Sequence, residues 1–244
     1  MSYFFIHCLT KVGYFGSLES QQPELSRDQL FMADVLLQLM NASSTNALET
    51  GVCNLQEKSS MLENDIAEVG GSLEPSLVLL NHSCDPNTIR INCQGHIILM
   101  ANRNISEGQE ISIGYYLTYA ETDMEARQKY LKRKYLFDCK CPACAEKWPT
   151  KDLMPKSFDD LNENQMMFDM ENTMMLMQQV NKIQKVGSSI SQEQRAGNYK
   201  KAFGLCIEFI KVLQDTLKKP HSYYLMAEKS LFKLAWILHG SHLR

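Results

Sequence analysis

The chain has 244 residues, which is long enough for one or two domains. Its residues are 44% apolar and 22% charged, an ordinary composition for a globular protein. Its net charge of −3 disfavours a dedicated nucleic-acid surface, because neutralising phosphates requires clustered Lys and Arg. The basic run 127–134 is expected to be the solvated face of a helix. The apolar start, residues 3–9, lacks a basic flank and is too short to cross a bilayer, so neither secretion nor a membrane partner is predicted.

The first 70 residues are predicted to be mixed and partly helical. Residues 25–40 have helical periodicity, with Ser26 as the N-cap. The apolar face of this helix is formed by Leu30, Ala33, Leu37 and Met40. Residues 61–69 are a weaker helical candidate, and the polar stretch 41–60 is expected to be a loop.

In residues 71–148 the apolar residues no longer have helical spacing and instead occur in short strand-like runs. The runs 88–92 and 96–101 flank Gln94-Gly95 and predict a β-hairpin, and a turn at 105–108 precedes a third strand over 110–115. Thr122 begins a capping-box pattern that predicts a helix ending near Lys134. A cysteine-rich loop, Pro149 and a polar linker follow.

Residues 160–244 are predicted to be helical throughout. Two amphipathic helices, centred on residues 199–213 and 224–238, are separated by Pro220. Residues 197–202 resemble the start of the second helix of a tetratricopeptide unit. The methionines of 166–177 have helical spacing and predict a buried stripe or, second, an adaptable binding surface.

Cysteines carry the strongest signal in the sequence. Cys139, Cys141 and Cys144 form a C-x-C-x-x-C loop, which supplies three of the four ligands of a tetrahedral zinc site. Spacing does not select the fourth ligand, but Cys84 within Asn-His-Ser-Cys-Asp-Pro-Asn is the candidate. A disulfide framework is the alternative, although it belongs to secreted chains. The other four cysteines, at 8, 53, 93 and 206, are expected to be small buried apolar residues.

The segments 81–87 and 139–144 together resemble the SET domain of lysine methyltransferases with its zinc-binding post-SET loop, and more narrowly the SET and MYND domain family. The resemblance covers residues 70–144. It implies an α+β fold in which the late SET strands and the zinc loop are followed by an all-α, tetratricopeptide-like C-terminal domain. The implied domains are a helical part of the split SET region (1–70), the C-terminal part of the SET core (71–119), the post-SET zinc loop (120–148) and the helical domain (160–244).

The resemblance also implies the cofactors zinc and S-adenosylmethionine, and a role for each site residue. Tyr115 ends the predicted strand at the position of the family's catalytic tyrosine, with Tyr116 and Tyr119 as competing candidates; its phenol, with a pKa near 10, stays protonated at neutral pH. The cofactor contacts are expected at Asn46 (or Asn41), Asn81, His82, Tyr115, Tyr135 and Phe137. Tyr135 would form a wall of the lysine channel, and Phe137 would pack on the adenine.

The predicted function is S-adenosylmethionine-dependent protein-lysine methyl transfer, which depends on near-attack geometry and a desolvated amine. The alternative is a non-catalytic, zinc-stabilised interaction module, and a zinc-ribbon nucleic-acid binder is disfavoured. Neither the Gly-x-Gly segment that opens a SET domain nor a MYND finger precedes the Asn-His-Ser-Cys motif. We therefore expect the chain to be the C-terminal portion of a larger protein, to bind the cofactor weakly alone and to have no measurable activity alone.

The expected partners are a protein substrate, histone or non-histone, that presents a lysine side chain, and a further protein at the C-terminal helices. A direct nucleic-acid partner is not expected. The reduced cysteines predict a cytoplasmic or nuclear location.

Overall fold

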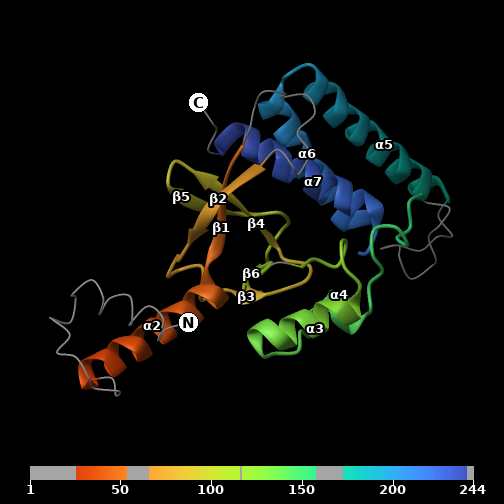
Figure 1. The fold of residues 1–244 in the computed structure, drawn as a ribbon. Coiled ribbons are helices and arrows are strands. Elements are labelled where there is room, and N and C mark those ends of the chain that lie inside the picture. The colour runs from red at the N-terminus through yellow and green to blue at the C-terminus, as the bar shows by residue number, and fades with distance from the viewer. Residues whose placement is uncertain (1–25, 54–65, 116, 158–172, 241–244) are drawn as a thin grey trace. The chain divides into compact units, whose positions relative to one another are not determined.

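The computed structural model describes residues 26–53, 66–115, 117–157 and 173–240 (Figure 1). The chain divides into two compact units. One is formed by residues up to Leu48 with Ser72–Pro75, and the other by Glu49–Gly71 with Ser76–Arg244. The candidate site, apart from Asn46, lies in the second unit.

The first unit contains helix α2, Arg27–Asn46. Ser26 caps it as predicted: its hydroxyl accepts from the backbone N–H of Gln29, and the Gln29 side chain accepts from the N–H of Ser26. The helix continues six residues beyond the predicted end at Met40, into the stretch expected to be a loop. On the predicted apolar face only Ala33 is buried, while Leu30 and Leu37 are 48% and 45% exposed.

Strands β1 (Leu48–Cys53) and β2 (Ile66–Ser72) form a two-stranded sheet where a loop and a weak helix were expected. Both expectations were wrong. Gly70 and Gly71 lower helix propensity, and Gly70 has a φ of 153° that side chains rarely adopt. The strand pair is a contact between distant residues, so a local window of sequence does not contain it.

The predicted hairpin is present. Strands β4 (Thr88–Cys93) and β5 (His96–Ala101) are antiparallel, and Cys93 pairs with His96 across a two-residue turn. Gln94 and Gly95 have φ values of 47° and 83°, which is the type I′ turn that matches the twist of the strands.

Strands β3 (Asn81–His82) and β6 (Ser112–Ile113) pair in parallel, with His82 opposite Ile113. The strand predicted over 110–115 is thus reduced to two residues. The side chain of Asn87 replaces part of the ladder, because it donates to the Glu110 carbonyl at 2.8 Å and accepts from the Ser112 N–H at 2.9 Å. The pairing brings His82 beside the residues that follow β6.

Helix α3 (Met124–Tyr135) confirms the predicted helix, but its N-cap is Asp123, whose carboxylate accepts from the Ala126 N–H. The short helix α4 (Pro142–Ala145) follows in the cysteine loop. Residues 149–157, expected to be a linker, are bonded to the rest of the unit. The Lys151 N–H donates to the Ala120 carbonyl, and the Pro155 carbonyl accepts from Ser222.

Helices α5 (Thr173–Arg195), α6 (Tyr199–Thr216) and α7 (Ser222–His239) form the helical region predicted at the C-terminal end (Figure 1). Their core is apolar, with Cys206 fully buried as expected. Helix α7 also packs on β4, where Ile91 contacts Ala235 and Trp236. The methionines at 166–172 lie outside the described residues, and the side chains of 173–177 are likewise not described.

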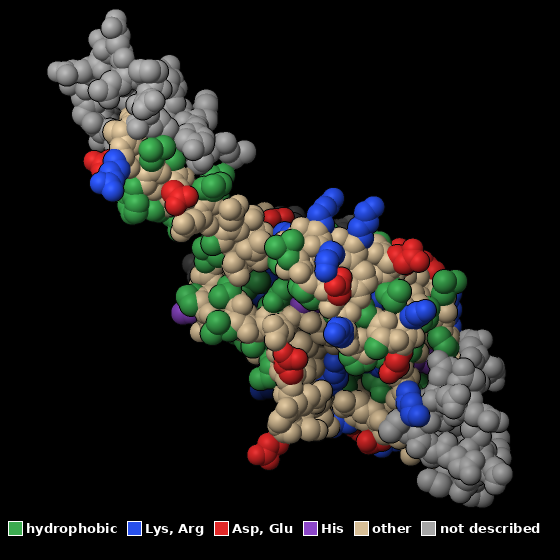
Figure 2. Space-filling view, turned by 90° about the horizontal axis from the view of Figure 1, so that it is seen from below, with side chains coloured by type: hydrophobic (Ala, Val, Ile, Leu, Met, Phe, Trp, Pro, Cys, Tyr) green, Lys and Arg blue, Asp and Glu red, His purple; other side chains and the backbone are tan. Residues whose placement is uncertain are grey.

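None of the helices among the described residues has an apolar stretch that would cross a bilayer. On the face drawn in Figure 2, the Lys and Arg side chains are mixed with Asp and Glu and with apolar side chains.

Candidate functional site

The structure brings the four predicted zinc ligands together. The sulfur atoms of Cys84, Cys139, Cys141 and Cys144 all lie within 4.8 Å of one another. The Cys84 sulfur is 4.0 Å from that of Cys139 and 3.6 Å from that of Cys144. Four thiolates at about 2.3 Å from one zinc ion would be about 3.8 Å apart, so the donor set fits zinc in both chemistry and spacing.

The protein holds both segments of this centre firmly. The Gln128 side chain, on α3, donates to the Cys139 carbonyl at 2.7 Å and accepts from the Cys139 N–H at 3.0 Å. The Cys84 carbonyl accepts from the Tyr119 N–H at 3.1 Å. Pro142 starts helix α4, which places Cys141 at its N-cap and Cys144 within it. The sulfur atoms are therefore preorganised by backbone contacts on both sides.

Arg127 is the functional residue that sequence reasoning missed. It was expected on a solvated helix face, but it is completely buried and one guanidinium nitrogen is 3.8 Å from the Cys144 sulfur. Within the described part of the chain, no carboxylate forms an ion pair with it. The signal was available, because Arg127 lies one helical turn before the buried Leu131 and so shares its face.

The cysteine cluster is electrostatically matched to this cation. Burial disfavours the charged guanidinium, but the Cys144 and Cys84 thiols outweigh burial and raise the pKa of Arg127. Hydrogen bonds from the Cys139 and Cys84 thiols lower the pKa of Cys141 below its ordinary value, and hydrogen bonding within the cluster raises the pKa values of Cys84 and Cys139. A buried positive charge requires a counter-charge, and the thiolates of a metal-bound centre would provide it.

His82 touches the cysteine centre directly. Its Nε2 is 3.3 Å from the Cys84 sulfur, and its Nδ1 accepts a hydrogen bond from the Tyr115 N–H at 3.1 Å. The ring is buried, and burial lowers the pKa of His82 to about 4. The imidazole is therefore neutral at neutral pH.

Half-buried aromatic rings surround His82. Tyr115 and Phe137 have ring centroids 5.2 and 6.1 Å from the His82 ring, and Tyr135 is 4.8 Å from Tyr115. The Tyr115 hydroxyl donates to the Leu80 carbonyl at 3.0 Å. The structure thus gathers the predicted residues His82, Tyr115, Tyr135 and Phe137 into one cluster beside the cysteines.

The two asparagines differ. Asn81 precedes His82 on β3, is exposed, and donates from its amide to a Glu110 carboxylate oxygen at 2.6 Å. Asn46 is the last residue of α2 in the other unit, where its amide donates to the Ala42 carbonyl.

The competing tyrosines are separated by their surroundings. Tyr119 is 3% exposed and packs edge-on against Trp148, and burial raises its pKa far above the ordinary value. It belongs to the apolar core around the cysteines. Tyr116 lies outside the described residues.

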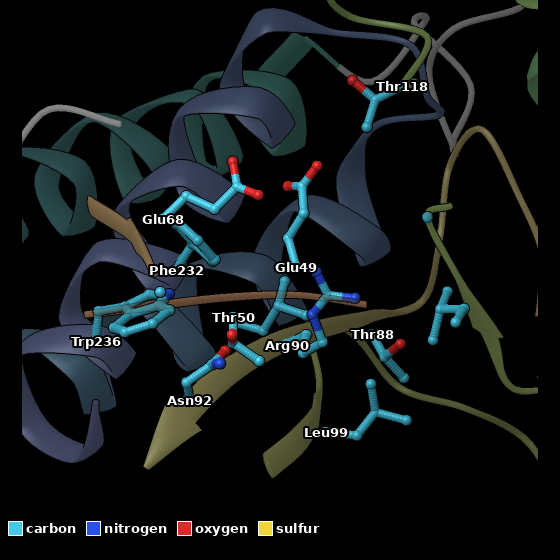
Figure 3. Close-up of a pocket in the computed structure, with 14 residues that line it drawn as sticks. Glu49, Thr50, Glu68, Thr88, Arg90, Asn92, Leu99, Thr118, Phe232 and Trp236 are labelled. Atoms are coloured by element: carbon cyan, nitrogen blue, oxygen red, sulfur yellow. The ribbon is translucent and has the colours of Figure 1, made fainter. Parts of the chain in front are cut away.

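A cavity of about 530 Å³, lined by residues of β1, β2, β4, β5 and α7, was not predicted from the sequence (Figure 3). Glu49 of β1, Glu68 of β2 and Arg90 of β4 provide its charges, and Phe232 and Trp236 of α7 provide aromatic surface. Burial lowers the pKa of Arg90, although Glu49 opposes that effect. The Trp236 indole N–H is buried with no hydrogen-bond partner among the described residues. Gly114, which precedes Tyr115, also lines the cavity.

Comparison with known proteins identifies the domain. Residues 14–116 match the model of the SET domain. Over 90 residues the chain is 40% identical to histone-lysine N-methyltransferase SMYD3 of Mus musculus, a match that covers 37% of this chain and 21% of that protein.

Two further relatives align over longer segments. Protein-lysine N-methyltransferase SMYD4 of Homo sapiens is 32% identical over 124 residues, or 50% of this chain and 15% of that protein. Histone-lysine N-methyltransferase ASHR1 of Arabidopsis thaliana is 28% identical over 137 residues, which cover 55% of this chain and 28% of that protein. The matches span less than a third of each relative. Residues 14–116 of this chain are therefore similar to the SET domain, and the relatives that the chain matches over part of its length are lysine N-methyltransferases.

Proposed function

We propose that the protein is an S-adenosylmethionine-dependent protein-lysine N-methyltransferase. To that activity this chain contributes the zinc centre, the Asn81–His82 segment and Tyr115. The observation that carries the proposal is the direct contact between a four-cysteine centre and an aromatic cluster that holds Tyr115. Names of the relatives, all lysine methyltransferases, support the same reaction class.

Cys84, Cys139, Cys141 and Cys144 would hold one zinc ion. S-adenosylmethionine would be held by the exposed amide of Asn81, the backbone of His82 and the flat faces of Phe137 and Tyr135. When bound, this cofactor supplies an electrophilic methyl group on a sulfonium. An aromatic and partly buried surface next to a polar amide suits an adenosine group with a charged tail.

The chain's own residues would orient and desolvate the substrate amine. The Tyr115 hydroxyl donates its hydrogen bond to the Leu80 carbonyl, so the lone pairs of its oxygen can accept a hydrogen bond from the amine. Burial raises the pKa of Tyr115, so it acts as a fixed acceptor rather than as a base. The rings of Tyr115 and Tyr135 exclude water from the amine, which must be neutral to react.

We propose that the protein substrate lies in the cavity beside β4. Glu49 and Glu68 outnumber Arg90, so the cavity favours a basic segment, and Gly114 connects it to Tyr115. Histone and non-histone lysines are both compatible with this chemistry.

The remaining assignments are also proposals. We infer the domains 1–70, 71–119, 120–148 and 160–244, with a tetratricopeptide-like helical region that binds a further protein. The packing of α6 against both α5 and α7, and the short joint at residues 196–198 between α5 and α6, support that inference. Unpaired cysteines in the described chain support a cytoplasmic or nuclear location.

The test is to measure by calorimetry the binding of S-adenosylmethionine to the zinc-loaded chain. The variant is Phe137→Ala, and the control is Leu136→Ala at the exposed neighbouring position. We expect weak binding that Phe137→Ala removes and Leu136→Ala leaves unchanged. Methyl transfer to lysine peptides is then measured with a longer protein that contains this chain. Full zinc loading with no cofactor binding by either protein would instead support the non-catalytic interaction module.

A further inference from the structure

We propose that His82 couples the zinc centre to Tyr115, as a positioning residue whose two ring nitrogens serve one partner each. The Nε2–H donates to the Cys84 thiolate, and Nδ1 holds the backbone N–H of Tyr115. This role goes beyond the cofactor contact proposed for His82. It rests on zinc occupancy of the proposed centre and not on methyl transfer.

The geometry fixes the position of the ring proton. The partner at Nδ1 is a backbone N–H 3.1 Å away, which can only donate, so Nδ1 is the unprotonated nitrogen. A neutral imidazole then carries its proton on Nε2. That nitrogen is 3.3 Å from the Cys84 sulfur, so the sulfur is the acceptor.

The surroundings hold the ring in this orientation. His82 is 9% exposed and Cys84 is fully buried, so the contact between the ring and the sulfur is shielded from bulk water. The rings of Tyr115 and Phe137 pack at 5.2 and 6.1 Å from it. The pairing of His82 with Ile113 in the β3–β6 ladder holds the backbone of His82 next to the strand that precedes Tyr115.

Zinc binding would strengthen this link. A zinc-bound cysteine is a thiolate, and a hydrogen bond to an ionised acceptor is about twice as strong as one to a neutral group. When the metal leaves, Cys84 becomes a thiol and a weak acceptor, so the ring loses its anchor. Outer partners of metal ligands orient those ligands in this way. Metal occupancy would therefore reach the Tyr115 backbone through one imidazole.

Two substitutions separate the two nitrogens. The amide nitrogen of Gln is separated from Cβ by the same number of bonds as Nε2 of histidine. The amide oxygen of Asn is likewise separated from Cβ by the same number of bonds as Nδ1. His82→Gln therefore keeps a donor for Cys84, whereas His82→Asn keeps an acceptor for Tyr115 and loses the donor. His96→Asn, at an exposed histidine on β5, is the matched control.

Zinc affinity is measured on the full chain by competition with a chelator. We expect His82→Asn to weaken zinc binding by about 10- to 100-fold, the usual loss for an outer partner of a metal ligand. His82→Gln and His96→Asn should stay within about threefold of the wild type. An unchanged affinity in His82→Asn, or an equal loss in His82→Asn and His82→Gln, would overturn the assignment of Nε2.

The second readout needs no variant at position 82. Amide hydrogen exchange at Tyr115 is compared in the wild-type chain with and without zinc. We expect faster exchange at Tyr115 after zinc removal, while Ile91, in the core under α7, keeps its protection. Identical exchange at Tyr115 in both states would overturn the coupling. Neither readout requires cofactor binding or turnover, so a failure of the proposed enzyme activity would be seen separately.

Discussion

Tyr115 has a hydroxyl whose proton is already committed to the Leu80 carbonyl, which directs the lone pairs of the oxygen elsewhere. Tyr119 is another tyrosine in this region, but its hydroxyl has different surroundings. Tyr119 is buried in the core around the cysteines, and its hydroxyl has no hydrogen-bond partner among the described residues. The two residues therefore provide a test and its control.

We expect Tyr115→Phe to lower the turnover number for methyl transfer by about 10²–10³-fold, as for the loss of one preorganised hydrogen-bonding group. Cofactor affinity should change little, because the hydroxyl acts on the amine. Turnover is measured with a longer protein that contains this chain, and calorimetry gives the cofactor affinity. Tyr119→Phe should retain turnover. Equal turnover of Tyr115→Phe and wild type would remove Tyr115 from the catalytic role.

Arg127 is the second residue with a clear consequence, because its removal would leave the thiolates of a zinc-bound centre without the cation that is buried against them. We expect Arg127→Met to weaken zinc binding and to lower the free energy of unfolding by about 3–5 kcal/mol, the range for a broken buried ion pair. Arg127→Lys keeps the charge and should lose less. Arg133→Met, at an exposed position of the same helix, is the control for both measurements, chelator competition and denaturant unfolding.

At the scale of elements, the cysteine loop depends on contacts outside its own secondary structure. The loop contains only the four-residue helix α4, which is too short to be stable by itself. Its apolar contacts include the buried Ala143 and Trp148. Metal binding is therefore expected to be coupled to the folding of this loop.

Cys84→Ser tests the one-plus-three arrangement. We expect substoichiometric zinc by elemental analysis, together with proteolytic cleavage in 139–148 that the wild type resists. Cys93→Ser, on the hairpin and outside the cluster, should keep one zinc per chain. The opposite pattern, with zinc lost in Cys93→Ser and retained in Cys84→Ser, would show that the fourth ligand is wrong.

At the scale of the whole second unit, a buried ionic cluster joins the SET segment to the C-terminal helices. Asp85, next to the proposed zinc ligand Cys84, contacts Arg103 at 3.0 Å and Lys219 at 2.7 Å. Lys219 also pairs with Glu228 of α7, and Arg103 lies 3.8 Å from Glu228. Two cations and two anions, two of them from the SET segment and two from the C-terminal helical region, therefore neutralise one another.

We expect Lys219→Met to lower the free energy of unfolding by about 3 kcal/mol, because it leaves two buried carboxylates with one cation. The SET segment and the helices should still unfold together, measured by Trp fluorescence and circular dichroism. Lys201→Met breaks an exposed pair within the helical region and should leave the unfolding midpoint unchanged. A midpoint for Lys219→Met equal to that of the wild type would show that the cluster contributes nothing.

The sequence by itself determined whatever is encoded in a short window. Gln94-Gly95 between alternating runs specified the hairpin, because a type I′ turn requires positive φ. Apolar spacing located α6 and α7, and the C-x-C-x-x-C spacing located three of the four clustered cysteines. Each of these features depends on residues a few positions apart.

Only the tertiary structure decided the features that join distant segments. These include the β1–β2 pair in place of a loop and helix, and the shortening of the third strand, where Asn87 takes over backbone hydrogen bonds. They also include the burial of Arg127 against the thiols and the contact of His82 with both Cys84 and Tyr115. Local propensities are worth about 1 kcal/mol or less per residue, whereas leaving a buried charge or backbone group unpaired costs more, so long-range pairing overrides them.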